Sequence, residues 1–139
     1  MKILIVEDDT NRRYFFRQLF ANDDLAITDD VALAKAKLAV ETFDLIMLDH
    51  DLGDVVYDNS HENSGYAVAC FIERTNIRTP VIIHTQNPVG AERIYKTVPC
   101  GFKIPFPYIE NEVMSLDATP FFEPLICAIR QNLALSGSN

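Results

Sequence analysis

The feature that most constrains the fold is a set of short apolar runs, each of which ends in a cluster of polar residues. The clusters are Glu7-Asp8-Asp9 after residues 1–6, Asp49-His50-Asp51 after residues 44–48, and His84-Thr85 after residues 79–83. Apolar runs of this length are typical of strands buried on both faces of a parallel sheet. Because ligands bind at the carboxyl ends of parallel strands, we expect these acids and Thr85 to lie together there. Carboxylates packed so closely repel one another unless a cation or protons intervene, and hard oxygen ligands favour Mg²⁺ or a similar ion.

Helical patterns alternate with these runs along the chain. Helices are predicted over about 10–21, 30–41, 65–74, 91–96 and 121–133, and two further strands over 25–28 and 100–104. Thr10, Asp30 and Ser64 are the predicted helix caps. The alternation predicts one doubly wound α/β domain, a five-stranded parallel sheet between two layers of helices with the flavodoxin-like order 2-1-3-4-5. We predict that this domain spans residues 1–135 and that residues 136–139 form a flexible tail.

Three stretches lack a periodic pattern. Residues 49–63 are rich in polar residues and predict a loop, and residues 86–90 predict a turn. A stretch marked by Pro105, Pro107 and Pro120 is predicted to be irregular.

The composition narrows the classes of function. A net charge of −8 over 139 residues argues against direct DNA binding, since nucleic-acid surfaces are normally basic. Cys70, Cys100 and Cys127 lack the spacing of a zinc site and suit a reducing compartment. The sequence shows neither a signal peptide nor a membrane span. We therefore expect a cytoplasmic protein that acts through other proteins or small molecules.

Four segments carry a family resemblance: residues 3–9, 44–49, 64–65 and 80–85. In order and spacing they resemble the receiver domain of two-component response regulators over nearly the whole chain. The resemblance implies that Asp49 accepts a phosphoryl group from a histidine kinase or phosphotransfer protein and that the chain signals to a downstream protein partner. It implies that the Thr85 side chain switches rotamer so that its hydroxyl meets the phosphoryl group. The metal ligands that it implies for Mg²⁺ or Mn²⁺ are Asp8, Asp9, Asp49 and Asp51, the last through its backbone carbonyl.

The chain departs from the receiver pattern where the family has a lysine. Ile104 stands at that position, and Lys103 lies one residue earlier. A shift of one residue along a strand turns the side chain to the other face, so we expect Lys103 to miss the phosphate. Gln86 also replaces a residue that is usually small in receivers.

Two histidines add a second possibility. His50 and His84 stand at the ends of strands that we expect to be neighbours, so we expect the imidazoles to approach each other. The segments around them, His-Asp-Leu-Gly at residues 50–53 and His-Thr-Gln-Asn-Pro-Val-Gly at residues 84–90, resemble a divergent receiver group proposed to process cyclic phosphates. The resemblance implies that a metal polarises a phosphate ester and that a histidine acts as general acid or base. Three functions therefore remain open: a phosphorelay receiver, a metal-dependent phosphoesterase that uses His50 and His84, and a pseudo-receiver that binds a protein partner without phosphorylation.

Overall fold

The computed structural model describes residues 1–53 and 63–136. Residues 54–62 of the predicted polar loop and residues 137–139 of the predicted tail lie outside this range. The strands are β1 Lys2–Val6, β2 Asp24–Thr28, β3 Leu45–Leu48, β4 Val81–Ile83 and β5 Gly101–Lys103. The helices are α1 Thr10–Leu19, α2 Val31–Val40, α3 Gly65–Arg74, α4 Pro88–Thr97, α5 Phe106–Met114 and α6 Phe122–Ser136. None of the helices in the described part of the chain is long and apolar enough to cross a membrane.

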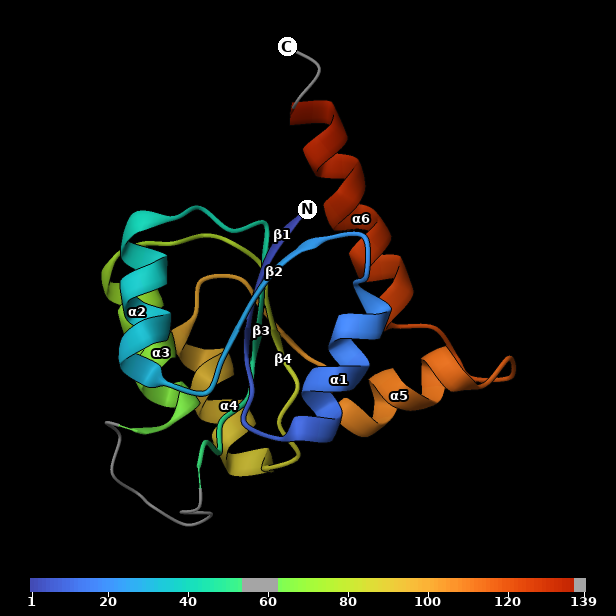
Figure 1. Ribbon diagram of the computed structural model, residues 1–139, viewed down its shortest axis with the longest axis horizontal. Helices are drawn as coiled ribbons and strands as arrows, with labels where there is room; N and C mark the ends of the chain where they lie inside the picture. The colour runs from blue at the N-terminus through green and yellow to red at the C-terminus, as the bar shows by residue number, and fades with distance from the viewer. Residues whose placement is uncertain (54–62, 137–139) are drawn as a thin grey trace.

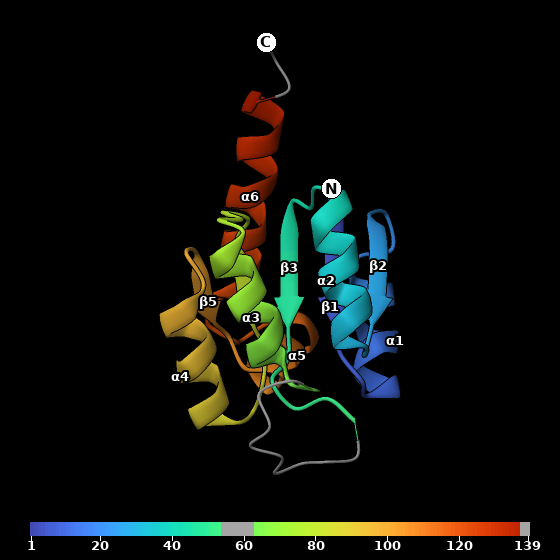
Figure 2. The same ribbon diagram turned by 90° about the vertical axis from the view of Figure 1, so that its left-hand side faces the viewer.

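All five strands run parallel in the order β2-β1-β3-β4-β5, which confirms the predicted fold class and topology. Helices α2, α3 and α4 cover one face of the sheet, and α1, α5 and α6 cover the other (Figures 1 and 2). The sheet separates two hydrophobic cores, the first beneath α2, α3 and α4 and the second beneath α1, α5 and α6. Successive side chains of a strand point to opposite faces, so Leu4 and Val6 lie in the first core and Ile3 and Ile5 lie in the second. This alternation decides which core each residue beyond a strand end faces.

The helix starts differ from the predictions at two places. Asp9, rather than Thr10, caps α1, because its side chain accepts the backbone N–H of Arg12. The predicted turn at 86–90 is the beginning of α4, with Asn87 as the cap and Pro88 in the first helical turn. Proline is well tolerated there because its missing N–H has no partner in the helix.

The proline-rich stretch is a helix where an irregular segment was predicted. Helix α5 starts directly after Pro105, and Pro107 lies in its first turn. The Glu112 carboxylate then accepts the backbone N–H groups of Phe121, Phe122 and Glu123 at 2.6–2.9 Å. An acid of α5 thus caps α6, and α6 continues to Ser136, one residue into the predicted tail.

An ion pair links Arg130 of α6 to Asp23, the residue directly before β2. Both terminal nitrogens of Arg130 donate to the Asp23 carboxylate at 2.8 Å, and the amino group of Met1 donates to it at 2.9 Å. The hydrogen bond with Arg130 is the main reason that the pKa of Asp23 falls from 3.8 to about 2. A two-pronged pair of this kind is stronger than an ordinary surface salt bridge.

We predict that Asp23→Asn lowers the free energy of unfolding at pH 7 by about 1–2 kcal/mol. Because the folded-state pKa lies below the unfolded one, this contribution is present above pH 3.8 and is lost as the pH falls toward 2. Chemical denaturation at pH 7 and at pH 2.5 measures the difference. The control is Asp24→Asn, which changes the exposed neighbour; an equal loss from both substitutions would contradict the assignment.

Candidate functional site

The carboxyl ends of β1, β3 and β4 surround a cavity of about 240 Å³, which we call the acidic pocket. Its lining residues are Asp8, Asp9, Arg12, Asp49, Asp51, Gly53, Thr85, Gln86 and Asn87. All four predicted metal ligands and Thr85 therefore lie around one cavity. Gln86, which stands where receivers usually have a small residue, lies at the exposed rim of this pocket.

Local hydrogen bonds hold the outer acids in place. The Asp8 carboxylate accepts the backbone N–H of Gly53 at 2.9 Å, and Asp9 accepts that of Arg12 at 2.9 Å. Each contact uses one oxygen, so each carboxylate keeps a second oxygen for another ligand. Hard oxygen donors of this kind suit Mg²⁺ or Mn²⁺.

Asp49 lies at the floor of the acidic pocket and is only 3% exposed. Its Oδ1 accepts the backbone N–H of His50 at 2.8 Å, and the Thr85 hydroxyl also hydrogen-bonds to its carboxylate. The pKa of Asp49 rises to about 7, mainly because the carboxyl group is buried and in part because the Glu7 carboxylate lies nearby. A divalent cation in the pocket would stabilise the ionised form of Asp49 and act against this shift.

Glu7 and His84 lie beneath Asp49 and are fully buried. Glu7 Oε2 accepts the backbone N–H groups of Asp8 and Asp9, and Glu7 Oε1 lies 3.2 Å from His84 Nε2. Burial raises the pKa of Glu7 and lowers that of His84 to about 4. The His84 imidazole is therefore neutral at pH 7 and offers its acidic neighbours little compensating charge.

The expectation that the two imidazoles approach each other is wrong. Leu48 pairs with Ile83, so His50 and His84 stand one residue out of step across the two strands and face opposite sides of the sheet. His84 contacts Phe16 of α1, with ring centroids 5.1 Å apart, whereas the His50 ring lies against Gly90 of α4. Neither histidine lines the acidic pocket.

His50 instead holds Asp51. Its Nδ1 lies 2.8 Å from Asp51 Oδ1, and the Asn87 side-chain amide donates to the same oxygen at 3.4 Å. Asp51 faces the acidic pocket, so this network fixes a carboxylate at the pocket wall from behind. The sequence did not single out Asn87 for this role, although a residue with a short side-chain amide at a helix start is a recognisable cap.

Arg12 is the functional candidate that the sequence reasoning missed. Its Nη1 lies 3.5 Å from Glu7 Oε1 and 3.8 Å from Asp49 Oδ2, and its guanidinium lies over the Phe106 ring. It stands in the first turn of α1, directly after the acidic end of β1. A basic residue three positions after a cap at a strand end is the signal that would have indicated it.

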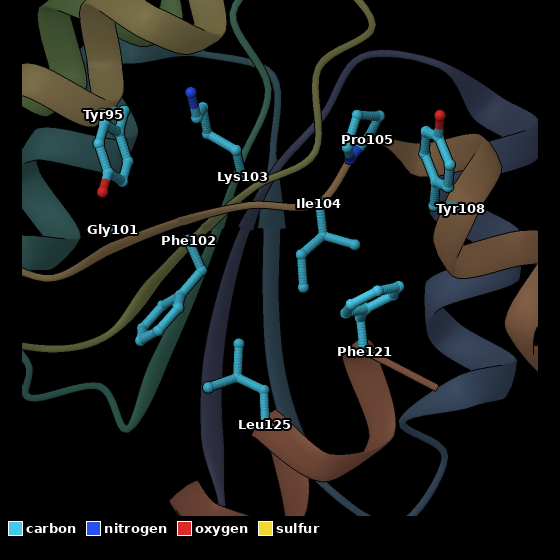
Figure 3. A pocket seen from close by; sticks show the side chains of 9 residues that line it. All are labelled: Tyr95, Gly101, Phe102, Lys103, Ile104, Pro105, Tyr108, Phe121 and Leu125. Atoms are coloured by element: carbon cyan, nitrogen blue, oxygen red, sulfur yellow. The ribbon is translucent and has the colours of Figure 1, made fainter. Parts of the chain in front are cut away.

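Lys103 lies away from the acidic pocket, as its position in the strand predicts. Its ammonium pairs with Glu92 at 2.7 Å and lies over the Tyr95 ring. Lys103 and Ile104 leave the chain in opposite directions, and both line a separate cavity of about 710 Å³ with mostly apolar walls (Figure 3). None of the acidic site residues belongs to that cavity. Among the described residues, Arg12 is thus the basic residue that lines the acidic pocket.

We predict that Gly90→Ala destabilises the protein by about 1–3 kcal/mol, because a Cβ there would lie 2.4 Å from His50 Cγ. In a His50→Ala background the same change should be neutral or stabilising by up to about 1 kcal/mol, the usual helix preference for alanine. Denaturant unfolding of the four proteins in this double-mutant cycle measures the coupling. Additive effects would show that the His50 ring does not occupy this space.

Comparison with known proteins places these features in a family. A model of the family described as "Cyclic-phosphate processing Receiver domain" matches residues 2–99. Among curated proteins, no match was found.

Several solved structures are similar to this chain in fold. The receiver domain of an HD domain-containing protein from Pseudomonas fluorescens is 18% identical, with 99% of this chain and 98% of that chain covered and a TM-score of 0.63. The N-terminal domain of a response regulator/sensory box/GGDEF protein from Carboxydothermus hydrogenoformans is 22% identical, with 100% and 98% covered and a TM-score of 0.62. The response regulator TrrA from Thermotoga maritima, solved with Mg²⁺-BeF, is 18% identical, with 81% and 94% covered and a TM-score of 0.61.

At these identities the structural likenesses establish the fold, and the family match establishes the relationship. The family match covers all the residues of the acidic pocket and those beneath it. The chain belongs to the cyclic-phosphate processing receiver domain family.

Proposed function

We propose that this chain is a divalent-cation-dependent phosphoesterase of receiver fold that opens cyclic phosphate esters in the acidic pocket. The observation that carries the proposal is the place of Arg12, whose guanidinium shares the pocket with the carboxylates of Asp8 and Asp49. The pocket thus places carboxylate oxygens that can bind a metal ion beside a guanidinium that can bind a phosphate. The description of the family supports the same chemistry.

Each residue has a role that follows from its chemistry. Asp8, Asp49 and the backbone carbonyl of Asp51 would hold Mg²⁺ or Mn²⁺, and Asp9 adds negative charge at the rim. The bound ion would offset the charge that develops on the phosphate oxygens. Arg12 binds the phosphate by paired N–H donors, and the Thr85 hydroxyl supplies a further hydrogen bond.

The proton transfers are assigned to Asp51. Its carboxylate takes a proton from water as the water oxygen bonds to phosphorus, and then returns it to the ring oxygen that leaves as the P–O ester bond breaks. His50 and Asn87 position Asp51 for this task. His84 acts through Glu7 and Asp49, because its buried ring does not face the pocket.

A second candidate function is phosphoryl acceptance by Asp49 in a phosphorelay. It is favoured by the arrangement of Asp8, Asp49 and Thr85 around one pocket at the ends of β1, β3 and β4. A histidine kinase or phosphotransfer protein would supply the phosphoryl group, and a protein partner would read the result. The position of Lys103, paired with Glu92 outside the pocket, weighs against it.

We predict that the purified protein hydrolyses 2′,3′-cyclic nucleotides in the presence of Mg²⁺, followed by ³¹P NMR. Asp49→Asn and Arg12→Gln should each lower kcat/KM by at least about 100-fold, because each removes charge stabilisation of the transition state. Lys103→Gln is the matched control for Arg12→Gln and should leave kcat/KM within about twofold, because Lys103 lies outside the pocket.

Acetyl phosphate separates the two candidates. No turnover of cyclic nucleotides, together with a phosphate adduct that is lost in Asp49→Asn, would contradict the esterase and support the phosphorelay receiver. If the folded protein shows neither reaction, the pseudo-receiver that binds a partner without phosphorylation replaces both.

A further inference from the structure

Behind the acidic pocket lies a second group of metal-ligating side chains, which we call the inner cluster. It consists of Glu7, Asp49 and His84, whose donor atoms all lie within 4.8 Å of one another. The three residues come from the ends of β1, β3 and β4 and are 0%, 3% and 0% exposed. The inner cluster shares only Asp49 with the oxygen ligands proposed above.

Backbone hydrogen bonds aim the inner cluster at one point. Glu7 Oε2 is occupied by the N–H groups of Asp8 and Asp9, which leaves Oε1 facing His84 Nε2. Asp49 Oδ1 is occupied by the N–H of His50, which leaves Oδ2 on the side of Arg12. Each carboxylate is therefore held through one oxygen by backbone N–H groups, which leaves its second oxygen for another ligand, as outer-shell contacts do in metal sites.

Two carboxylates buried this closely require a compensating charge. Arg12 supplies part of it, but its Nη1 lies at 3.5 and 3.8 Å from the two carboxylates, longer than a charged hydrogen bond of about 2.7–2.9 Å. Arg12 also lines the acidic pocket, so its guanidinium has space into which it can withdraw.

The donor set favours a transition metal. One imidazole nitrogen and two carboxylate oxygens suit zinc and its neighbours better than Mg²⁺, which prefers oxygen ligands and keeps several waters. The distance of 3.2 Å between His84 Nε2 and Glu7 Oε1 is also that of two ligands each about 2.1 Å from a shared ion.

We propose that Glu7, Asp49 and His84 form an inner binding site for a divalent transition metal ion, and that Arg12 withdraws from Glu7 and Asp49 when the ion binds. The withdrawn guanidinium then faces the acidic pocket, where a phosphate would meet it. This site goes beyond the proposed function, because it binds metal whether or not a phosphate ester is present.

Co²⁺ is the probe, added to protein stripped of metal and followed by calorimetry and visible absorption. Wild-type protein should bind Co²⁺ at an inner site with the absorption of an ion that has a nitrogen ligand and fewer than six ligands, in addition to any weaker binding by the oxygen ligands of the acidic pocket. His84→Gln should weaken binding by at least about 100-fold, since loss of an outer-shell partner alone costs about 10- to 100-fold. Arg12→Gln should tighten binding by at least about threefold, because it removes the competing cation.

Two variants serve as controls. His50→Gln makes the same change at the other histidine, on the opposite face of the sheet, and should leave Co²⁺ affinity unchanged. Asp8→Asn removes a ligand of the acidic pocket only and should also leave it nearly unchanged. Unfolding in the presence of a chelator verifies that His84→Gln is folded, and Glu7→Gln gives an independent second loss of affinity.

The proposal is overturned if wild-type protein binds no Co²⁺, or if His84→Gln binds it as tightly as wild type. It is also overturned if Asp8→Asn abolishes binding while His84→Gln does not, because the ion then lies in the acidic pocket. Failure of the cyclic-nucleotide assay with Mg²⁺ leaves these outcomes unaffected, so the two proposals are tested separately.

Discussion

The structure depends on how two buried carboxylates are accommodated at the carboxyl end of the sheet. Glu7 and Asp49 follow β1 and β3, which pair directly, so their side chains meet beneath the acidic pocket. Burial raises the pKa of both acids and lowers that of His84. Backbone N–H groups and the Arg12 guanidinium offset part of the negative charge of the two carboxylates. This arrangement is costly in an apolar interior, which makes a role in binding a cation or a phosphate the best explanation for it.

The cation that faces the acidic pocket comes from α1. The end of β5 presents Ile104 to the second core, and Lys103 is held by Glu92 on α4. Arg12 reaches Asp49 from the first turn of α1, and the Phe106 ring supports its guanidinium. A guanidinium binds phosphate through two N–H donors, whereas an ammonium acts as a point charge. The pocket is thus suited to hold a phosphate ester in a defined orientation.

The features of the site that depend only on the order of the strands could be predicted from the sequence. Parallel strands bring their carboxyl ends to one edge, so the meeting of Asp8, Asp49 and Thr85 follows from strand order alone. The faces of His50 and His84 depend on the register between β3 and β4, which strand order does not supply. Helix α5 was missed because prolines stand at its start, where they are tolerated, and because its acid Glu112 caps α6 from a distance along the chain. The direction of Arg12 depends on how α1 is rotated against the sheet, which a single sequence does not reveal.

The central claim is that the acidic pocket binds phosphate through Arg12 and a divalent cation together. Calorimetry of inorganic phosphate binding, with and without Mg²⁺, in wild type and Arg12→Gln tests it most directly. We predict that Mg²⁺ tightens phosphate binding to wild type, that phosphate tightens Mg²⁺ binding by the same factor, and that Arg12→Gln weakens phosphate binding by at least about tenfold. Phosphate affinity that is unchanged by Arg12→Gln, or independent of Mg²⁺, would contradict the claim.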